Sequence, residues 1–277
     1  MSLRIISWTD DAFEPLADDS AMTIGVFDGV HLGHQALINR VVRRGPNPTL
    51  VTFMENPKKL VSPEVFEGDI SSLNQKLCIF GQMGICQVIL IDFSEKFSRM
   101  NGWEFLEILS CRGRMVFLAI GSNFRCGHRQ GTGAESIREI NDRRKIPTDV
   151  VMPVVTGDAP GSAPVNSSRI RAAILAGELK LAAALMGRKL ELDLSGMLPD
   201  GLRFAGSQPG IGIANQRSGG AVYDFRTARR IIPPSGKYPV LINPGVIEGE
   251  ALINGGKLYL PPVDGVDNYR AESLEFL

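Results

Sequence analysis

The chain has 277 residues, enough for one large domain or two smaller ones, each with its own hydrophobic core. Its 30 Lys and Arg residues balance its 30 Asp and Glu residues, so net charge does not point to a nucleic acid or an anionic membrane as a partner. No apolar run reaches the roughly 20 residues of a membrane helix, and the first residues lack the layout of a signal peptide. We therefore expect a soluble cytoplasmic protein with no nucleic-acid or membrane partner.

The cysteines agree with a cytoplasmic setting. They number 4 and are scattered, without a CxxC pair or a histidine at ligand spacing. Reduced thiols are therefore predicted, and no protein-held metal site is expected.

The first two-thirds of the chain alternate strand-like and helix-like stretches. Strands are predicted at 22–27, 49–53, 87–92 and 115–120, and helices at 32–43, 71–83, 101–109 and 179–186. Strands that alternate with helices are typical of a parallel sheet covered on both faces. The fold class is therefore predicted to be α/β, with a Rossmann-like domain.

Two histidines stand where the first of these strands leads into a helix. A turn is predicted at residues 28–29 and a helix start at about Leu32, so His31 and His34 flank Gly33 at that corner. A helix N-terminus presents unpaired N–H groups and a partial positive charge, which suit a phosphate. The imidazoles can donate hydrogen bonds to oxygens whose charge grows during phosphoryl transfer. This corner is the predicted catalytic centre.

Residues 121–133 follow the strand at 115–120 and are too glycine-rich for a regular element. In a parallel sheet this loop lies at the same edge as His31 and His34, where it can wall the cleft. Its basic and amide groups suit a phosphate or a heteroaromatic ring. The alternative is a flexible crossover loop with solvated arginines.

Residues 165–171, which read VNSSRIR, precede a helix predicted at 172–176. Their serines can cap that helix. Serine hydroxyls and arginine guanidinium groups also suit a polyphosphate.

Residues 25–34, which read GVFDGVHLGH, resemble the HxGH signature of the nucleotidyltransferases. The FDGVHxGH form is similar to that of the bacterial FAD synthetases, the adenylyltransferase half of bifunctional riboflavin kinase/FMN adenylyltransferases. The resemblance implies transfer of AMP from ATP, with Mg²⁺, to FMN, which gives FAD and pyrophosphate. It makes His31 and His34 catalytic. The residues that it assigns to the ATP site here are Phe27, Asp28, Gly29 and Gly33.

Two further segments resemble the flavin side of that family. The loop at 121–133 is similar to the motif GxDFRFGxxRxG, with Asn123 in place of the aspartate and Cys126 in place of the second phenylalanine. One residue is missing after Gly127. Residues 52–57 resemble TFxPHP, with Asn56 where the histidine belongs. The residues matched with the flavin side are Asn56, Asn123, Phe124, Arg125 and Arg129.

The segment at 165–171 resembles ISSTRIR, the second nucleotide-binding signature of the superfamily. By this resemblance Ser167, Ser168 and Arg171 hold the β- and γ-phosphates, which leave as pyrophosphate.

Residues 188–277 are predicted to form a small β-barrel-like domain, after a nucleotidyltransferase domain at 1–187. Short apolar runs alternate with Gly, Pro and Asn turns there, as in a riboflavin kinase domain. The PTAN motif of the kinase aligns with residues 212–215, which read GIAN, and Ile213 has no hydroxyl for Mg²⁺. We expect a degenerate kinase domain without kinase activity.

Two alternatives remain open. The chain could transfer a nucleotide to another phosphate acceptor, such as a pantetheine or nicotinamide phosphate. It could also be a non-catalytic flavin- or nucleotide-binding protein, because it lacks the histidine, the aspartate and the kinase residues of the family.

Overall fold

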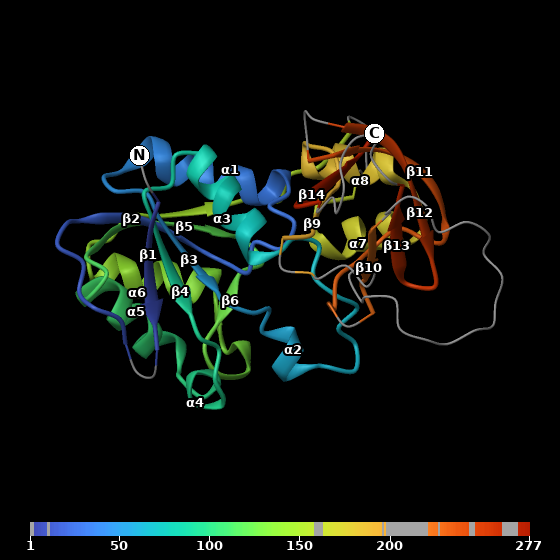
Figure 1. Cartoon of the computed structure of the whole chain (residues 1–277). Helices are drawn as coiled ribbons and strands as arrows, with labels where there is room; N and C mark the ends of the chain where they lie inside the picture. The colour runs from blue at the N-terminus through green and yellow to red at the C-terminus, as the bar shows by residue number, and fades with distance from the viewer. Residues whose placement is uncertain are drawn as a thin grey trace. The chain divides into compact units, whose positions relative to one another are not determined.

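The computed structural model describes residues 3–9, 12–157, 163–195, 197, 221–226, 228–243, 247–261 and 271–277. The chain divides into two compact units, the first comprising residues 1–66 and 73–166 and the second residues 67–72 and 167–277 (Figure 1). The helices at 167–186 are grouped with the second unit. The domain boundary at 187 stays a prediction.

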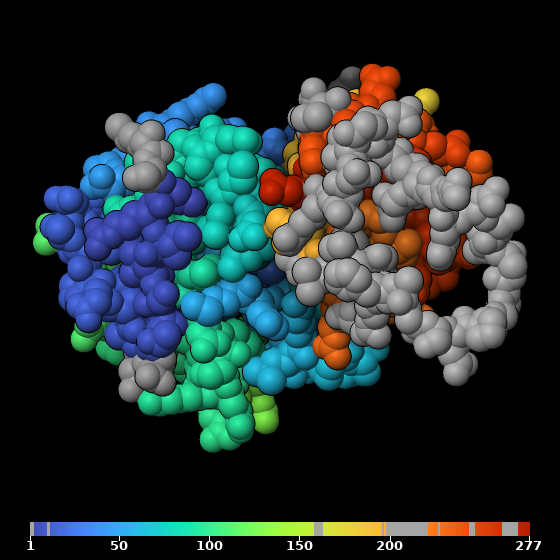
Figure 2. Space-filling view, in the orientation of Figure 1, coloured from blue at the N-terminus to red at the C-terminus, as the bar shows by residue number. Residues whose placement is uncertain are grey.

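A six-stranded sheet forms the centre of the first unit, with the strand order β1-β4-β3-β2-β5-β8. All its neighbouring strands run parallel, which confirms the predicted α/β class. Its strands are β1 (Arg4–Trp8), β2 (Ser20–Ile24), β3 (Thr49–Phe53), β4 (Gln87–Ile91), β5 (Met115–Gly121) and β8 (Thr148–Val151). At one edge, β1 (dark blue in Figure 2) reaches the surface, and Ile5 is 50% exposed.

Helices cover both faces of this sheet. Its helices are α1 (Leu32–Arg44), α2 (Lys58–Val61), α3 (Leu73–Gln82), α4 (Glu95–Ser98), α5 (Gly102–Cys111) and α6 (Ala134–Arg143). Successive side chains of a strand point to opposite faces. Leu50 therefore packs with Ile38 of α1 and Phe80 of α3, whereas Val51 packs with residues of α5 and α6. None of the described helices is long and apolar enough to cross a bilayer.

The order in which strands are added to the sheet changes direction at β2. From β2 it passes to β3 and β4 on one side, and later to β5 and β8 on the other. Ligands of open parallel sheets bind outside the carboxyl ends of the strands at such a switch point. The segments that follow β2, β3 and β5 therefore meet at the edge expected for a ligand.

The loop after β5 is more regular than its glycines predicted. Residues 125–126 (β6) pair with residues 132–133 (β7), and a 3₁₀ turn at 128–130 lies between them. Helix α6 and strand β8, which follow, have no counterpart among the predicted elements.

The described part of the second unit contains two helices and a curled antiparallel sheet, in agreement with the predicted β-rich character. Its sheet has six strands in the order β10-β13-β12-β11-β14-β9. Its elements are α7 (Ser167–Leu175), α8 (Leu179–Met186), β9 (Glu191–Asp193), β10 (Ala221–Asp224), β11 (Gly236–Ile242), β12 (Ile247–Asn254), β13 (Lys257–Leu260) and β14 (Ser273–Phe276). Residues 212–215 lie outside the described residues.

A buried tyrosine joins two segments of this second unit. The Tyr223 side chain is fully buried, and its hydroxyl donates to the Ala271 carbonyl at 3.1 Å and accepts from the Ala271 N–H at 3.0 Å. One hydroxyl thus satisfies two backbone groups.

Tyr223→Phe should lower the free energy of unfolding by about 1–3 kcal/mol, because it leaves a buried backbone donor and acceptor without this partner. Chemical denaturation measures the loss. Tyr238→Phe is the matched control, since the Tyr238 hydroxyl donates to the Pro234 carbonyl at an exposed position. Equal losses in the two variants would contradict the assigned contribution.

Candidate functional site

The segment between β2 and α1, residues 25–34, is called the histidine turn here. β2 ends at Ile24, earlier than predicted, because the backbone then leaves the extended conformation. Phe27, Gly29 and Val30 have φ values of 53°, 78° and 36°. A left-handed conformation is a genuine outlier for a β-branched residue such as Val30. Such strain costs on the order of 1–3 kcal/mol per residue and clusters at functional sites.

Side chains from neighbouring elements hold the carbonyls of the histidine turn. The Val26 carbonyl accepts from Thr52 Oγ1 at 3.2 Å and from Lys76 Nζ at 3.4 Å. The Val30 carbonyl accepts from Gln35 Nε2 at 2.9 Å. These contacts come from β3, α3 and α1, so the sheet and two helices fix the conformation of the turn.

The two histidines form a stacked pair at the start of α1. Their ring centroids are 3.6 Å apart, with an interplanar angle of 18°. His31 Nδ1 accepts a hydrogen bond from the His34 backbone N–H at 3.4 Å, which caps the helix. A ring nitrogen that accepts carries no proton, so the proton of His31 lies on Nε2. His31 therefore presents Nε2–H as a donor.

The first turn of α1 carries no acidic residue, whereas its last turn carries Arg43 and Arg44. The partial positive charge at its N-terminus is thus not offset within the helix. This end of α1 is favourable for an anion, and the phosphate site there stays a prediction.

Gly33 and Phe27 support the histidine pair. A Cβ at Gly33 would lie 3.2 Å from His31 ring atoms, so a glycine here leaves room for the stack. The Phe27 ring lies 5.1 Å from the His34 ring and 5.7 Å from the Phe80 ring, and it is fully buried. The Phe27 side chain is therefore enclosed by protein, and the assignment of Phe27 to the ATP site stays a prediction. Asp28 is also buried, at 3% exposed.

Asn56 follows β3 at the same edge of the sheet. It is 6% exposed, and its Oδ1 accepts from the Lys58 backbone N–H at 3.2 Å. The amide oxygen thus helps to turn the chain into α2.

The loop after β5 is folded against the start of α5. Gly127 has a φ of 77°, and a Cβ there would lie 2.3 Å from the Gly102 nitrogen, so only glycine fits. Arg125 Nε donates to the Gln130 carbonyl at 2.7 Å and closes the loop. This geometry favours a defined loop over the flexible one that the sequence left open.

The predicted flavin-side residues differ in exposure. Asn123, Arg125 and Arg129 are exposed, whereas Phe124 is half-buried and packs against the apolar core. Cys126 packs there as well, and burial raises the pKa of its thiol to about 12. Cys126 is therefore a neutral apolar side chain, which explains physically how it can replace a phenylalanine.

Ser167, Ser168 and Arg171 belong to the second unit. The structure corrects the prediction that they precede a helix, since α7 begins at Ser167. Both serines lie in the first turn of α7, and the partial positive charge of a helix N-terminus suits a phosphate. Arg171 is buried, and its Nε donates to the Gly68 carbonyl at 2.8 Å. The assignment of all three to the triphosphate stays a prediction.

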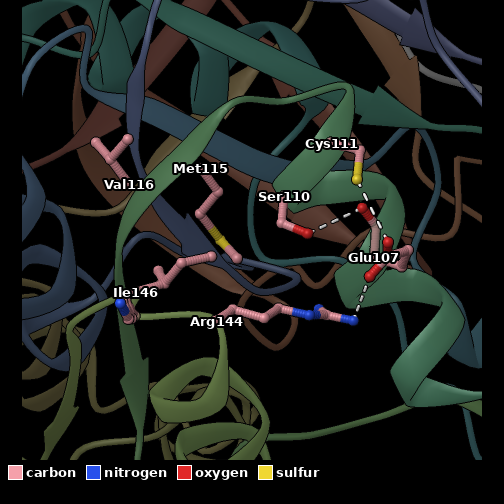
Figure 3. A pocket seen from close by; sticks show the side chains of 8 residues that line it. Glu107, Ser110, Cys111, Met115, Val116, Arg144 and Ile146 are labelled. Carbon is pink, nitrogen blue, oxygen red and sulfur yellow. Dashed lines mark hydrogen bonds and ion pairs between the residues drawn. The ribbon is translucent and has the colours of Figure 1, made fainter.

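A pocket of about 430 Å³ lies elsewhere in the first unit (Figure 3). It is near the start of β5, at the amino ends of the strands, so it lies away from the histidine turn. Its polar groups bind one another, because Glu107 accepts from Arg144 and from the Cys111 thiol. No predicted site residue lines it. No group of three or more His, Cys, Asp or Glu side chains in the described part of the chain is arranged to hold a metal ion.

Lys76 and Thr52 are residues of this site that the sequence analysis did not identify. Lys76 falls on the apolar face of α3, four residues before the buried Phe80. A lysine on the apolar face of a predicted helix was the feature of the sequence that could have identified Lys76.

The family model described as FAD synthetase matches residues 14–165, more than half of the chain. The bifunctional riboflavin kinase/FMN adenylyltransferase of Escherichia coli K12 is 27% identical over 190 residues, which cover 67% of this chain and 59% of that protein. That of Pseudomonas fluorescens is 24% identical and covers 92% of this chain and 78% of that protein. That of Buchnera aphidicola from Schizaphis graminum is 26% identical, over 63% and 56%. The chain thus spans little more than half the length of several relatives.

A solved structure described as a macrolide-efflux protein from Streptococcus pneumoniae has a TM-score of 0.75 and 21% identity. It covers 99% of this chain and 89% of that one, which shows a shared fold. The family match includes the histidine turn, residues 52–57 and the loop at 121–133. The chain belongs to the FAD synthetase family.

Proposed function

We propose that the chain transfers AMP from ATP, bound with Mg²⁺, to FMN, giving FAD and pyrophosphate. The observation that carries the proposal is the stacked pair of His31 and His34 at the N-terminus of α1. Membership of the FAD synthetase family supports it. We also propose a cytoplasmic setting, because the four cysteines carry free thiols.

The proposed reaction is a single displacement. A phosphate oxygen of FMN attacks the α-phosphorus of ATP. The bond from that phosphorus to the oxygen between the α- and β-phosphates breaks, and pyrophosphate leaves. A phosphate dianion needs no general base, so catalysis is positioning and charge stabilisation. His31 donates from Nε2 and His34 from its ring to the α-phosphate and bridging oxygens. Mg²⁺ arrives with the triphosphate, to which we also assign Asp28, Gly29 and Gly33.

On the acceptor side we assign the flavin to Asn56 and the loop at 121–133, because both follow strands adjacent to β2. Their exposed groups, Asn123, Arg125 and Arg129, are neutral or cationic, which suits FMN. We assign Ser167, Ser168 and Arg171 to the leaving pyrophosphate.

Replacement of both histidines tests the proposal. His31→Ala with His34→Ala should lower the rate of FAD formation at least about 100-fold, because donors aimed at the developing charge are lost. ATP binding, followed by calorimetry, should fall far less, since backbone N–H groups remain.

Asn39→Ala, at an exposed position of α1, is the control and should keep the wild-type rate. Unchanged FAD formation in the double variant would refute the role of the histidines. Tight FMN binding by the wild-type chain without any FAD would favour a non-catalytic flavin protein.

The C-terminal unit is proposed to lack kinase activity. The residues 212–215 offer Ile213 in place of the motif threonine, so no hydroxyl is available there for Mg²⁺. Riboflavin with ATP and Mg²⁺ should therefore yield no FMN by chromatography. Measurable FMN would overturn this proposal.

A further inference from the structure

We infer that Lys76, together with Thr52, positions the catalytic histidines by holding the Val26 carbonyl. The kinetic consequence of this inference rests on the proposed function. Lys76 is a positioning residue and is not assigned to any substrate.

Lys76 is unusual for a lysine because it is buried, at 6% exposed. It and Phe80 are the buried residues of α3 and lie one helical turn apart. Burial of an amino group costs free energy unless hydrogen bonds compensate it, and Lys76 Nζ lies 3.4 Å from the Val26 carbonyl oxygen. The contact with the Val26 carbonyl therefore offers a structural reason for the burial of Lys76.

The Val26 carbonyl lies at the start of the strained part of the turn. It belongs to the same planar peptide unit as the nitrogen of Phe27, whose φ is 53°. Because the peptide is planar, hydrogen bonds that fix the direction of the Val26 oxygen also fix the orientation of the peptide plane that precedes Phe27. Thr52 and Lys76 approach the oxygen from β3 and α3.

The same helix holds the turn at a second point. Phe80 packs edge-on against the Phe27 ring, with centroids 5.7 Å apart and an angle of 79°. The Phe27 ring contacts His34, which stacks on His31. A change in the peptide plane at Val26 thus moves Phe27 and, through it, both imidazoles.

Replacement of Lys76 by Met keeps an unbranched, flexible side chain that is one heavy atom shorter and removes the hydrogen-bond donor. We expect Lys76→Met to lower kcat for FAD formation about 10-fold or more, with KM for ATP and FMN changed less than about 3-fold, because the reacting geometry is lost and not binding. Lys76→Arg, which keeps a donor, should recover most of kcat. Lys180→Met, at an exposed position of α8, is the matched control.

A loss of stability without a change in kcat per folded molecule would overturn the inference. If Lys76→Met does not fold, Thr52→Val is the second test, because it removes the other donor to the Val26 carbonyl. It should likewise lower kcat and leave KM nearly unchanged. Wild-type kcat in folded Thr52→Val would then contradict the inference.

A second measurement does not depend on activity. The chain has 3 histidines, so each imidazole can be followed in a ¹H–¹⁵N long-range correlation spectrum. Lys76→Met should shift the resonances of the ring nitrogens of His31 and His34. Those of His128, which lies in the loop after β5, should stay unchanged. Unshifted His31 and His34 signals would overturn the inference. If the wild-type chain forms no FAD, the proposed function fails, and this spectrum still decides the role of Lys76.

Discussion

The hydrogen bond from the His34 backbone N–H to His31 Nδ1 organises the start of α1, on which the proposed chemistry depends. It closes the first turn of α1, stacks the two imidazoles, and leaves Nε2 of His31 as the protonated nitrogen. One contact thus caps a helix and orients a donor. A phosphate at this helix N-terminus would meet backbone N–H groups and imidazole donors together.

The strained turn requires support from the rest of the first unit. Phe27 and Val30 have positive φ values, which persist only where neighbours over-determine the conformation. Thr52 of β3, Lys76 of α3 and Gln35 of α1 each bind a carbonyl of the turn. The parallel sheet with helices on both faces supplies these three elements at the switch point beside β2.

Much of this arrangement could be predicted from local patterns. The strand at 49–53 and the helix at 179–186 were predicted to the residue, since apolar runs between strong turn residues have clear ends. The sequence also placed the loop at 121–133 at the same edge as His31 and His34, because the carboxyl ends of parallel strands share an edge. Asn56 was matched with the flavin side by resemblance alone. The sequence did not predict that α7 begins at Ser167. The burial of Lys76 beneath the turn could not be predicted, because it depends on a contact between residues distant in sequence. The role of Gly33 in the stack depends on the folded geometry as well, because His31 ring atoms lie 3.2 Å from the place that a Cβ at Gly33 would occupy.

The most direct test of the account is the protonation pattern of His31 in the wild-type chain at neutral pH. A long-range ¹H–¹⁵N correlation spectrum distinguishes the two nitrogens of each imidazole. The account predicts an unprotonated Nδ1 and a protonated Nε2 for His31. A proton on Nδ1 would break the cap to His34 and contradict the assignment of Nε2–H as the donor to the transferred phosphate.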